Sequence, residues 1–309
     1  MIIPPVCVGI DVSKHTLDIF REGSGYSRIS NDAPAVADLV AGLDADCFVV
    51  FEATGHYDAI LRKALERAGI AFSRVNPEQA RHFAKAIGRL AKTDPVDARM
   101  LAELGRRLAP RPEPASDPVR EELALLHKRR DQLVGMRQQE KVRLRECAHT
   151  QLRARLARHV AWLDGEVAEI EAEIAALVAE TPALREAGKR LRSIPGIGPA
   201  IAATLLALLP ELGARQPKPL AALAGLAPFN ADSGRSQGHR SIKKGRARVR
   251  RALYMAAFAA QRGNTRIAQK YRALCDAGKP RKVALVAVAR KILTIANALL
   301  RDQTTFNPA

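Results

Sequence analysis

The chain has only four cysteines, and none of them is spaced for a metal or redox site. Cys7, Cys47, Cys147 and Cys275 lie far apart along the 309 residues, and no CxxC pair occurs. This spacing argues against a disulfide framework and against a zinc site. We therefore expect reduced and mostly buried thiols.

Motifs for nucleotide hydrolysis and for membrane insertion are also missing. Neither GxxxxGK[ST] nor GxGxxG occurs, so the sequence shows no nucleotide-hydrolysing engine. No apolar run reaches the roughly 18 residues of a transmembrane helix, and the first residues, MIIPPVCVGIDVSK, lack the pattern of a signal peptide. We expect a bacterial cytoplasmic protein, nucleoid-associated if DNA is its partner, with no membrane partner.

Acidic residues are scarce relative to basic ones. There are 32 Asp and Glu against 50 Lys and Arg, which gives a formal charge of +18. Such an excess repels itself unless a polyanion offsets it, so nucleic acid is the leading partner and an anionic membrane surface the weaker one. The hydrophobic fraction of 47% supports a packed core, and the length allows two domains with or without a connector.

The first third of the chain alternates strand patterns with amphipathic helix patterns. We expect strands over 6–12, 16–22, 26–31, 47–54 and 71–76, and helices over 33–43, 57–69, 77–88 and from AKTDPVDARML (91–101) to about 107. This order predicts a mixed sheet with helices on it.

The middle of the chain predicts a linker and then long helices. APRPEPASDP (109–118) is rich in proline and polar residues, as linkers are. Beyond it, apolar residues recur at alternating steps of four and three, a heptad seam formed by Leu156, Val160, Leu163, Val167, Ile170, Ile174 and Leu177. This pattern fits a long helix or helical hairpin within one chain, and it fits equally a coiled coil that pairs protomers. Gly135 and Gly165 are candidate breaks.

The region from residue 182 onward predicts helices joined by loops. LRSIPGIGPAIAATLLALL (191–209) contains a short PGIG turn between two helical patterns, which indicates a helix-hairpin-helix. Gly196 and Gly198 would let the backbone approach a phosphate at the start of the second helix. The alternative is an ordinary glycine turn between core helices.

A basic segment follows that turn. DSGRSQGHRSIKKGRARVRR (232–251) holds eight Lys and Arg and one acid, a density that favours phosphate binding over a solvated charged face. Its candidate contacts are Arg235, Arg240, Lys243, Lys244, Arg246 and Arg250. Ser233 precedes a glycine that leaves its hydroxyl accessible, and Ser236 and Ser241 are the competing serines.

Four acidic residues in the first third could form a metal site. Asp11 lies inside an apolar strand, where a carboxylate is costly unless it is paired or bound to metal, and Glu52 ends a second apolar strand. Asp94 and Asp97 share one helix face. Neighbouring strands would bring all four together as hard oxygen ligands for Mg²⁺ or Mn²⁺. The alternative makes Asp94 a helix N-cap and Asp97 a first-turn acid.

Three stretches, VGIDVSKHTLDIF, FEATGHY and KTDPVDARMLAE, resemble the DEDD-type, RuvC-like domain of bacterial transposases of the insertion-sequence one-ten family. Two later stretches, LRSIPGIGPAIAATLLA and LAGLAPFNADSGRSQGHRSIKKGRARVRRALYMAA, resemble the family's C-terminal transposase domain. The resemblance implies that Asp11, Glu52, Asp94 and Asp97 are the catalytic metal ligands and that Ser233 forms a covalent bond with DNA. It also implies guidance by a non-coding RNA.

These observations predict an α/β domain followed by an all-α region. We expect an RNase H/RuvC-like mixed-sheet domain over 1–108, a linker and coiled-coil connector over 109–181, and a helical transposase domain over 182–309. The predicted activity is Mg²⁺-dependent DNA recombination on donor and target DNA by a homo-oligomer, a dimer or tetramer. A junction endonuclease that uses water and a non-catalytic nucleic-acid scaffold are the alternatives.

Overall fold

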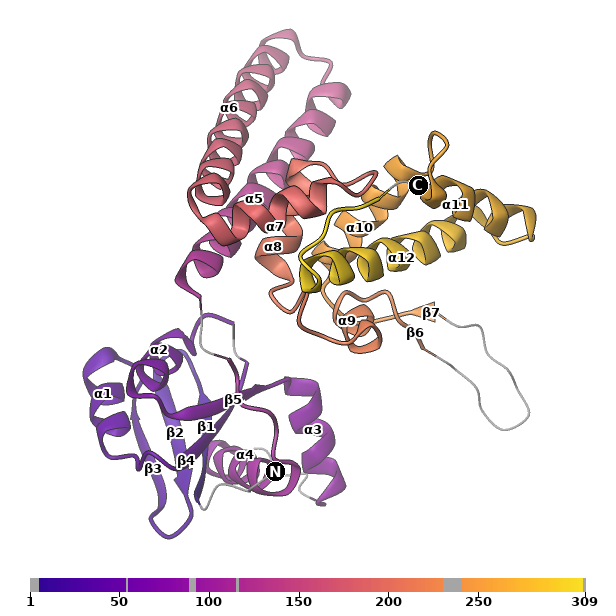
Figure 1. The fold of residues 1–309 in the computed structure, drawn as a ribbon. Helices are drawn as coiled ribbons and strands as arrows, with labels where there is room; N and C mark the ends of the chain where they lie inside the picture. Colours follow the sequence, from indigo (N-terminus) through magenta and orange to yellow (C-terminus); the bar gives the residue numbers. More distant parts are fainter. Residues whose placement is uncertain (1–5, 54, 89–92, 115–116, 230–240, 308–309) are drawn as a thin grey trace. The chain divides into compact units, whose positions relative to one another are not determined.

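The computed structural model describes residues 6–53, 55–88, 93–114, 117–229 and 241–307. The chain divides into two compact units, Met1–Ser116 and Asp117–Ala309 (Figure 1). Most of the predicted connector over 109–181 therefore belongs to the same compact unit as the helices that follow it. Each unit has its own core.

The first unit is an α/β domain. Its elements are β1 (Val6–Val12), β2 (Thr16–Arg21), β3 (Gly25–Ser30), α1 (Ala33–Ala41), β4 (Cys47–Glu52), α2 (Ala59–Ala68), β5 (Ala71–Val75), α3 (Pro77–Ala86) and α4 (Asp94–Leu108). The predicted elements of this region are all present, with bounds that differ by a few residues. The linker begins as a partner of the sheet, since the backbone N–H of Glu113 donates to Phe72 O at 2.7 Å.

The five strands form one mixed sheet in the order β3-β2-β1-β4-β5. β1 pairs with β4 in parallel, and β4 with β5, whereas β1, β2 and β3 form an antiparallel meander. The prediction of a mixed sheet is confirmed, and this arrangement is consistent with an RNase H-like domain. β1, which contains Asp11, and β4, which ends at Glu52, are neighbours, as the predicted metal site requires.

Helices cover both faces of the sheet. α1 and α2 pack on one face through residues such as Val36 and Leu61, which share a core with Val8 and Ile10. α4 and α3 pack on the other face, where Leu101 and Leu104 share a core with Cys7. Figure 1 shows the two pairs of helices on opposite sides of the strands.

The second unit is helical. Its elements are α5 (Pro118–Glu146), α6 (Thr150–Glu180), α7 (Pro182–Arg192), α8 (Pro199–Leu208), α9 (Pro217–Leu223), β6 (Pro228–Phe229), β7 (Ser241–Ile242), α10 (Ala247–Ala260), α11 (Arg266–Asp276) and α12 (Arg281–Arg301). Its main core is formed by α7, α8, α10 and α12 with parts of α5 and α6.

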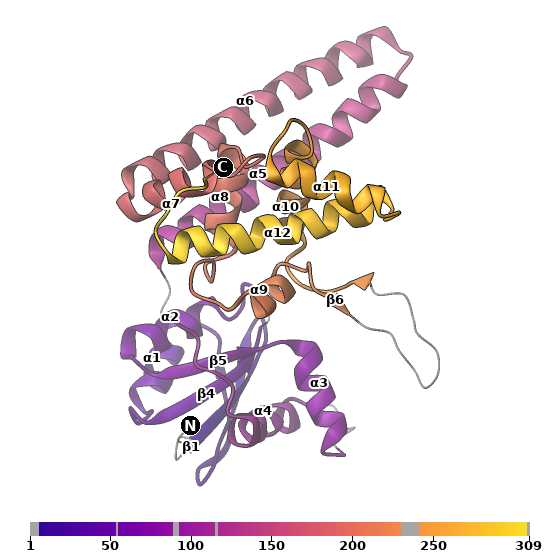
Figure 2. The same cartoon turned by 45° about the vertical axis from the view of Figure 1, so that its right-hand side comes forward.

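α5 and α6 form a helical hairpin, which both ribbon views show (Figures 1 and 2). The predicted seam residues Leu163 and Val167 pack against Leu133 of α5, so the intrachain alternative accounts for this part of the heptad pattern. Neither Gly135 nor Gly165 breaks its helix, because the reversal occurs between Glu146 and Thr150. A glycine inside a helix costs about 1 kcal/mol relative to alanine, which is small beside the packing of two long helices.

α12 is the described helix that is long and apolar enough to cross a bilayer by length and composition. Arg290 and Lys291 interrupt this helix, so it does not contradict the expectation that no uninterrupted apolar run reaches about 18 residues. Half of the apolar window in α12 is buried inside the protein, and Val288, Ile292 and Ala296 belong to the core of the helical unit. The prediction of a final core helix describes its packing correctly.

Candidate functional site

Asp11 and Glu52 occupy adjacent positions on neighbouring parallel strands. Ile10 of β1 is in register with Phe51 of β4, so the next residue on each strand is one of the two acids. Residues two apart on a strand share a face. Cys7 and Val50 pack toward α4, and therefore Asp11 and Glu52 face the same side of the sheet as α4.

α4 runs across that face with its first turn toward the acidic ends of the strands. A Cβ added to Gly105 would lie 2.8 Å from the Val50 side chain and 3.4 Å from Cys7 Sγ. A Cβ added to Gly9 would lie 2.0 Å from Ala98 O. Thus the helix passes Cys7 and then Gly9 on its way back to its N-terminus, which places Asp94 and Asp97 at the Asp11 end of β1.

The alternative interpretation of Asp94 as a helix N-cap is wrong in one detail. Thr93, and not Asp94, is the N-cap, and Asp94 is the first helical residue. The Thr93 side chain makes no capping hydrogen bond. Asp94 and Asp97 are both acids of the first turn, where the helix dipole favours negative charge. The dipole accounts for the presence of acids here, but it does not require two of them.

A fifth carboxylate, Asp18, lies beside the four predicted ones and was missed in the sequence. It pairs directly across from Asp11 in the β1–β2 hairpin, so the two side chains share a face. Asp18 is only 1% exposed. The hairpin register would have revealed it, because a three-residue connection between the strands sets Asp11 opposite Asp18.

Arg28 of β3 connects this fifth carboxylate to α4. Its Nε donates to Asp18 Oδ1 at 2.7 Å, and its Nη2 donates to Asp94 Oδ2 at 2.6 Å. The Tyr26 hydroxyl donates to the same Asp18 oxygen, and this hydrogen bond raises the pKa of Tyr26. The network ties Asp94 to the same end of the sheet as Asp11, which agrees with the path of α4.

The four predicted carboxylates are suitable ligands for a hard divalent cation, although their oxygen atoms are not gathered around one point. Carboxylate oxygens are the ligands that Mg²⁺ and Mn²⁺ prefer. Within the described part of the chain, three ligand atoms lie within 4.8 Å of one another only at Asp44, Asp46 and Cys47, near the start of β4 and away from Glu52. Like charges repel one another without a cation, and Arg28 already holds Asp94.

In the helical unit, the PGIG turn joins α7 to α8, with Gly198 as the N-cap of α8. Gly196 has φ +89°, and a Cβ there would lie 2.2 Å from Ala256 O. This glycine is therefore required by close packing of the turn on α10. Gly198 is exposed, and a Cβ there would meet open space. The predicted phosphate contact of both glycines stays a prediction, and only Gly198 is placed openly for it.

The predicted basic segment is described only in its second half. Ser233, Arg235, Ser236 and Arg240 lie outside the described residues. Lys243 is exposed, and Lys244 adopts φ +58° in the turn before α10.

Two arginines of that segment make contacts within the chain. Arg246 Nη2 donates to Glu211 Oε1 at 2.7 Å, and Arg250 Nη1 donates to Lys244 O at 2.8 Å. Burial is the largest single influence and raises the pKa of Glu211, but the hydrogen bond from Arg246, a backbone hydrogen bond and the charges of Arg246 and Arg215 together lower that pKa below its usual value. Arg246 and Arg250 therefore hold the loop in place, and their predicted phosphate contacts stay predictions.

Two transposase families match this chain. The DEDD family of IS110, described as Transposase, matches residues 8–150 and so includes all four predicted acids. The family described as Transposase IS116/IS110/IS902 family matches residues 188–272, from the PGIG turn through the basic segment. The chain belongs to the IS110 family of transposases.

Individual relatives agree with this membership. The transposase is 29% identical to the pilin gene-inverting protein of Moraxella lacunata over 318 residues, 97% of either chain. It is 35% identical to the uncharacterized 44.8 kDa protein of insertion element IS116 from Streptomyces clavuligerus over 122 residues, 38% of this chain and 30% of that protein. The chain is a DNA recombination enzyme, and its DEDD domain suggests the use of a divalent metal.

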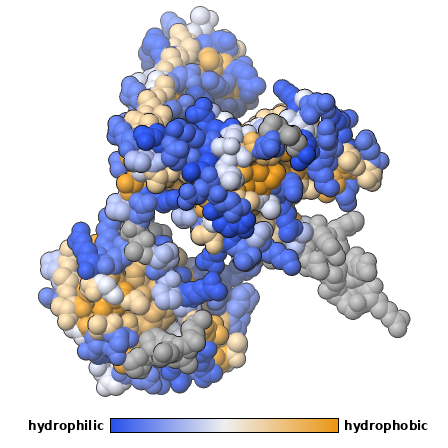
Figure 3. All heavy atoms as spheres, in the orientation of Figure 1, coloured by the Kyte–Doolittle hydropathy of each residue, from blue (hydrophilic) through white to orange (hydrophobic). Residues whose placement is uncertain are grey.

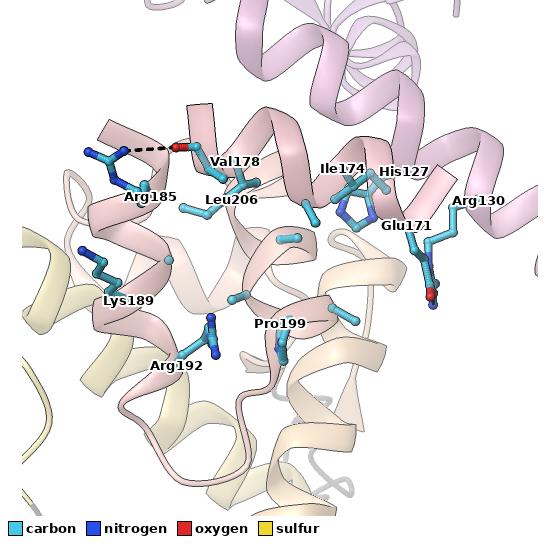
Figure 4. A pocket seen from close by; sticks show the side chains of 16 residues that line it. His127, Arg130, Glu171, Ile174, Val178, Arg185, Lys189, Arg192, Pro199 and Leu206 are labelled. Atoms are coloured by element: carbon cyan, nitrogen blue, oxygen red, sulfur yellow. Dashed lines mark hydrogen bonds and ion pairs between the residues drawn. The ribbon is translucent and has the colours of Figure 1, made fainter. Parts of the chain in front are cut away.

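A pocket of about 490 Å³ lies beside the PGIG turn of the transposase. Apolar residues of α6 and α8, such as Ile174 and Leu206, form its interior, and α7 contributes Arg185, Lys189 and Arg192 (Figure 4). The visible face of the helical unit is mostly hydrophilic, with smaller hydrophobic patches (Figure 3). The pocket thus places positive charge next to the turn for which phosphate contact is predicted.

Arg28 offers a test of the network around the acids. We expect Arg28→Ala to lower DNA cleavage by the transposase about 10- to 100-fold, because Arg28 holds Asp94, a predicted metal ligand, and loss of a side chain that orients a ligand typically has an effect of this size. Asp18 would keep its buried charge without the guanidinium, so the free energy of unfolding should also fall by roughly 1–3 kcal/mol. Cleavage kinetics and urea denaturation measure the two effects.

Arg21→Ala is the matched control. Arg21 is the last residue of β2, away from Asp18 near the start of that strand, and it pairs with Asp44. That pair is solvent-exposed on the Asp44 side and should contribute about 0–1 kcal/mol. Its loss should leave cleavage unchanged. Wild-type cleavage by a folded Arg28→Ala protein would show that Arg28 does not orient Asp94.

Proposed function

We propose that Asp11, Glu52, Asp94 and Asp97 bind Mg²⁺ or Mn²⁺ and that Ser233 cuts DNA by forming a covalent bond with it. The observation that carries this proposal is the register of β1 and β4, which sets Asp11 beside Glu52 on the face crossed by α4. Divalent ions held by these carboxylates would stabilise the charge on the attacking and leaving oxygens of a phosphodiester.

The proposed reaction conserves the number of phosphoester bonds. Ser233 Oγ attacks a DNA phosphorus, a serine–phosphate bond forms, and the bond to one sugar oxygen breaks. The serine loses its proton and the departing sugar oxygen gains one. A sugar hydroxyl of a new strand then attacks the same phosphorus and loses its proton, the serine–phosphate bond breaks, and the departing Ser233 Oγ gains a proton. No nucleotide hydrolysis is needed, in keeping with the missing phosphate-binding loop.

The relatives support a reaction that breaks and rejoins strands. The Moraxella proteins, which are similar over nearly the whole chain, are named for inverting a pilin gene, and inversion and transposition both require strand exchange. We extend this to donor and target DNA for the present chain. The charge of +18 is in keeping with a protein that holds DNA together with a guide RNA.

We further propose that Arg235, Arg240, Lys243 and Gly198 bind nucleic-acid backbone near Ser233. The carboxylates and the serine belong to different compact units. The family resemblance implies that they act together, within a protomer or between the protomers of a dimer or tetramer. Guidance by an element-encoded non-coding RNA completes the proposal and follows from the family resemblance alone.

The decisive experiment is a search for a protein–DNA adduct that survives denaturant. Purified protein, RNA transcribed from the flanks of the element and cognate DNA are incubated with Mg²⁺ and separated under denaturing conditions. We expect an adduct with the wild-type protein and none with Ser233→Ala. Ser241→Ala, which changes an exposed serine of the same basic segment, should keep it.

Two other outcomes would replace the proposal. Strand cleavage without an adduct, unaffected by Ser233→Ala and abolished by Asp94→Asn, would make the protein a hydrolytic, junction-type nuclease that uses water. DNA binding without Mg²⁺-dependent cleavage, unaffected by either change, would make it a scaffold. Adduct formation that needs no added RNA would remove the guide from the proposal and leave the serine chemistry intact.

A further inference from the structure

Trp162, the one tryptophan of the chain, lies exposed on α6. Its exposed fraction is 54%, in a protein that has only 4% aromatic residues. The neighbouring seam residues Val160 and Leu163 are buried, so Trp162 points away from the seam that packs on α5. Packing within the hairpin therefore does not explain this side chain.

The indole is held in place by a neighbouring ring. His159, one turn earlier on α6, stacks on Trp162 with 5.8 Å between ring centroids and an interplanar angle of 17°. His159 Nδ1 lies 3.6 Å from Glu140 Oε2 of α5, and Glu140 also accepts a hydrogen bond from Arg143. Glu140 is only 7% exposed. The buried carboxylate thus lies beside the histidine ring, and the histidine ring stacks on the indole.

Positive charge surrounds this stacked pair. Between Arg137 and Arg158 the hairpin carries seven Lys and Arg and two Glu. Arg155 and Arg158 precede Trp162 by seven and four residues and so lie on the same side of α6. Both are exposed, and neither has an acidic partner among the residues that the structure describes. Their guanidinium groups are available for phosphates.

A second copy of the chain fits this surface less well than nucleic acid does. The complementary partner would be the acidic half of α6, but part of its charge is already used within the hairpin. Asp164 pairs with Arg137 at 2.8 Å and Glu171 with Arg130 at 2.7 Å. Basic halves of two copies would repel each other. An exposed ring beside unpaired arginines is what single-stranded nucleic acids stack on.

We propose that Trp162, supported by His159, is a platform on which an unpaired base of a single-stranded nucleic acid stacks, with Arg155 and Arg158 on the flanking phosphates. The site would contact an unpaired RNA loop or a displaced DNA strand, which share this chemistry. The inference requires that the protein binds nucleic acid, but it does not depend on the metal site or on Ser233.

Tryptophan fluorescence tests the platform directly, because Trp162 is the only source of indole emission. The full-length protein is titrated with oligouridylate, oligothymidylate and an abasic oligonucleotide of the same length. We expect both base-containing strands to quench the emission, because a stacked base lies against the indole, and the abasic strand to bind without quenching. Stronger quenching by oligouridylate would identify RNA as the source, and stronger quenching by oligothymidylate would identify DNA.

Variants give a second readout through the anisotropy of a labelled oligonucleotide. Trp162→Ala should weaken binding roughly 10-fold or more, because base–aromatic stacking contributes that much, while Trp162→Phe should keep most of the affinity. Leu152→Ala is the matched control, since Leu152 is 50% exposed on the same helix and should not matter. Strand cleavage of duplex DNA by Trp162→Phe should stay at the wild-type level.

Two results would overturn the proposal. Equal quenching by the abasic strand would show that phosphates bind near the indole without a stacked base. An emission shift that depends on protein concentration in the absence of nucleic acid would show that a second copy covers Trp162. Either result leaves the serine and carboxylate proposal untouched, because that proposal is tested by the covalent adduct.

Discussion

Replacing Gly9 with alanine is expected to unfold the α/β unit or to destabilise it by about 3 kcal/mol or more. The added Cβ would lie 2.0 Å from Ala98 O and 2.3 Å from Ala102 N, and these are backbone atoms of α4 that no rotamer change can move. Forcing one extra carbon into a packed core costs about 1–3 kcal/mol, occasionally more. Relief is possible only if α4 moves away from β1.

The same displacement should abolish activity, because α4 carries Asp94 and Asp97. Thermal unfolding and DNA cleavage would be measured on the Gly9→Ala protein together with Gly135→Ala. Gly135 lies inside α5, where a Cβ would meet nothing within 4 Å, so alanine there should stabilise the protein by up to about 1 kcal/mol. A Gly9→Ala protein of wild-type stability would contradict the close approach of α4.

Asp11→Asn is expected to abolish strand cleavage while leaving the protein folded. Because Asp11 is proposed to be a direct metal ligand, its loss should cost more than the roughly 10- to 100-fold that follows loss of an orienting side chain. Thermal unfolding without metal checks that the variant is folded. In the wild type, Mg²⁺ should raise the melting temperature by mass action, and this rise should disappear in the variant.

The control for Asp11 is Asp46→Asn, which removes an exposed carboxylate from the group near the start of β4. This variant should cleave DNA and respond to Mg²⁺ like the wild type. The metal proposal would fail if Asp11→Asn still gained thermal stability from Mg²⁺ and Asp46→Asn did not, because the ion would then bind at the opposite end of β4. Mn²⁺ binding measured by calorimetry provides the same comparison without DNA.

Much of the α/β unit could be predicted from the sequence because its central strands are short apolar runs separated by turns and amphipathic helices. β1 and β4 are clear apolar runs, and Asp11 and Glu52 stand out in them as acids at strand positions. Arg28 could not be found in this way. It lies on an edge strand whose residues are mostly exposed, and only the pairing of β3 with β2 brings it to Asp18.

The helical unit was harder to predict because periodicity does not reveal what covers a helix. The heptad pattern predicted a seam, but it could not decide between α5 of the same chain and a second protomer. The density of positive charge was also a poor guide to phosphate binding. Arg246 and Arg250 contribute to the basic segment, but their guanidinium groups donate hydrogen bonds to a carboxylate and a carbonyl of the same chain. The surroundings of Ser233 lie outside the described residues.

The contact of the linker with β5 also bears on self-association. β5 is an edge strand, and edge strands expose unpaired backbone groups on which another chain can add a strand and begin to aggregate. The Glu113 backbone already occupies the carbonyl of Phe72, and the Glu113 carboxylate fastens the segment to Arg74 of the same strand at 2.7 Å. The segment that leaves the sheet domain thus also covers part of its edge strand. Proteolytic cleavage of this segment should expose β5 and promote aggregation.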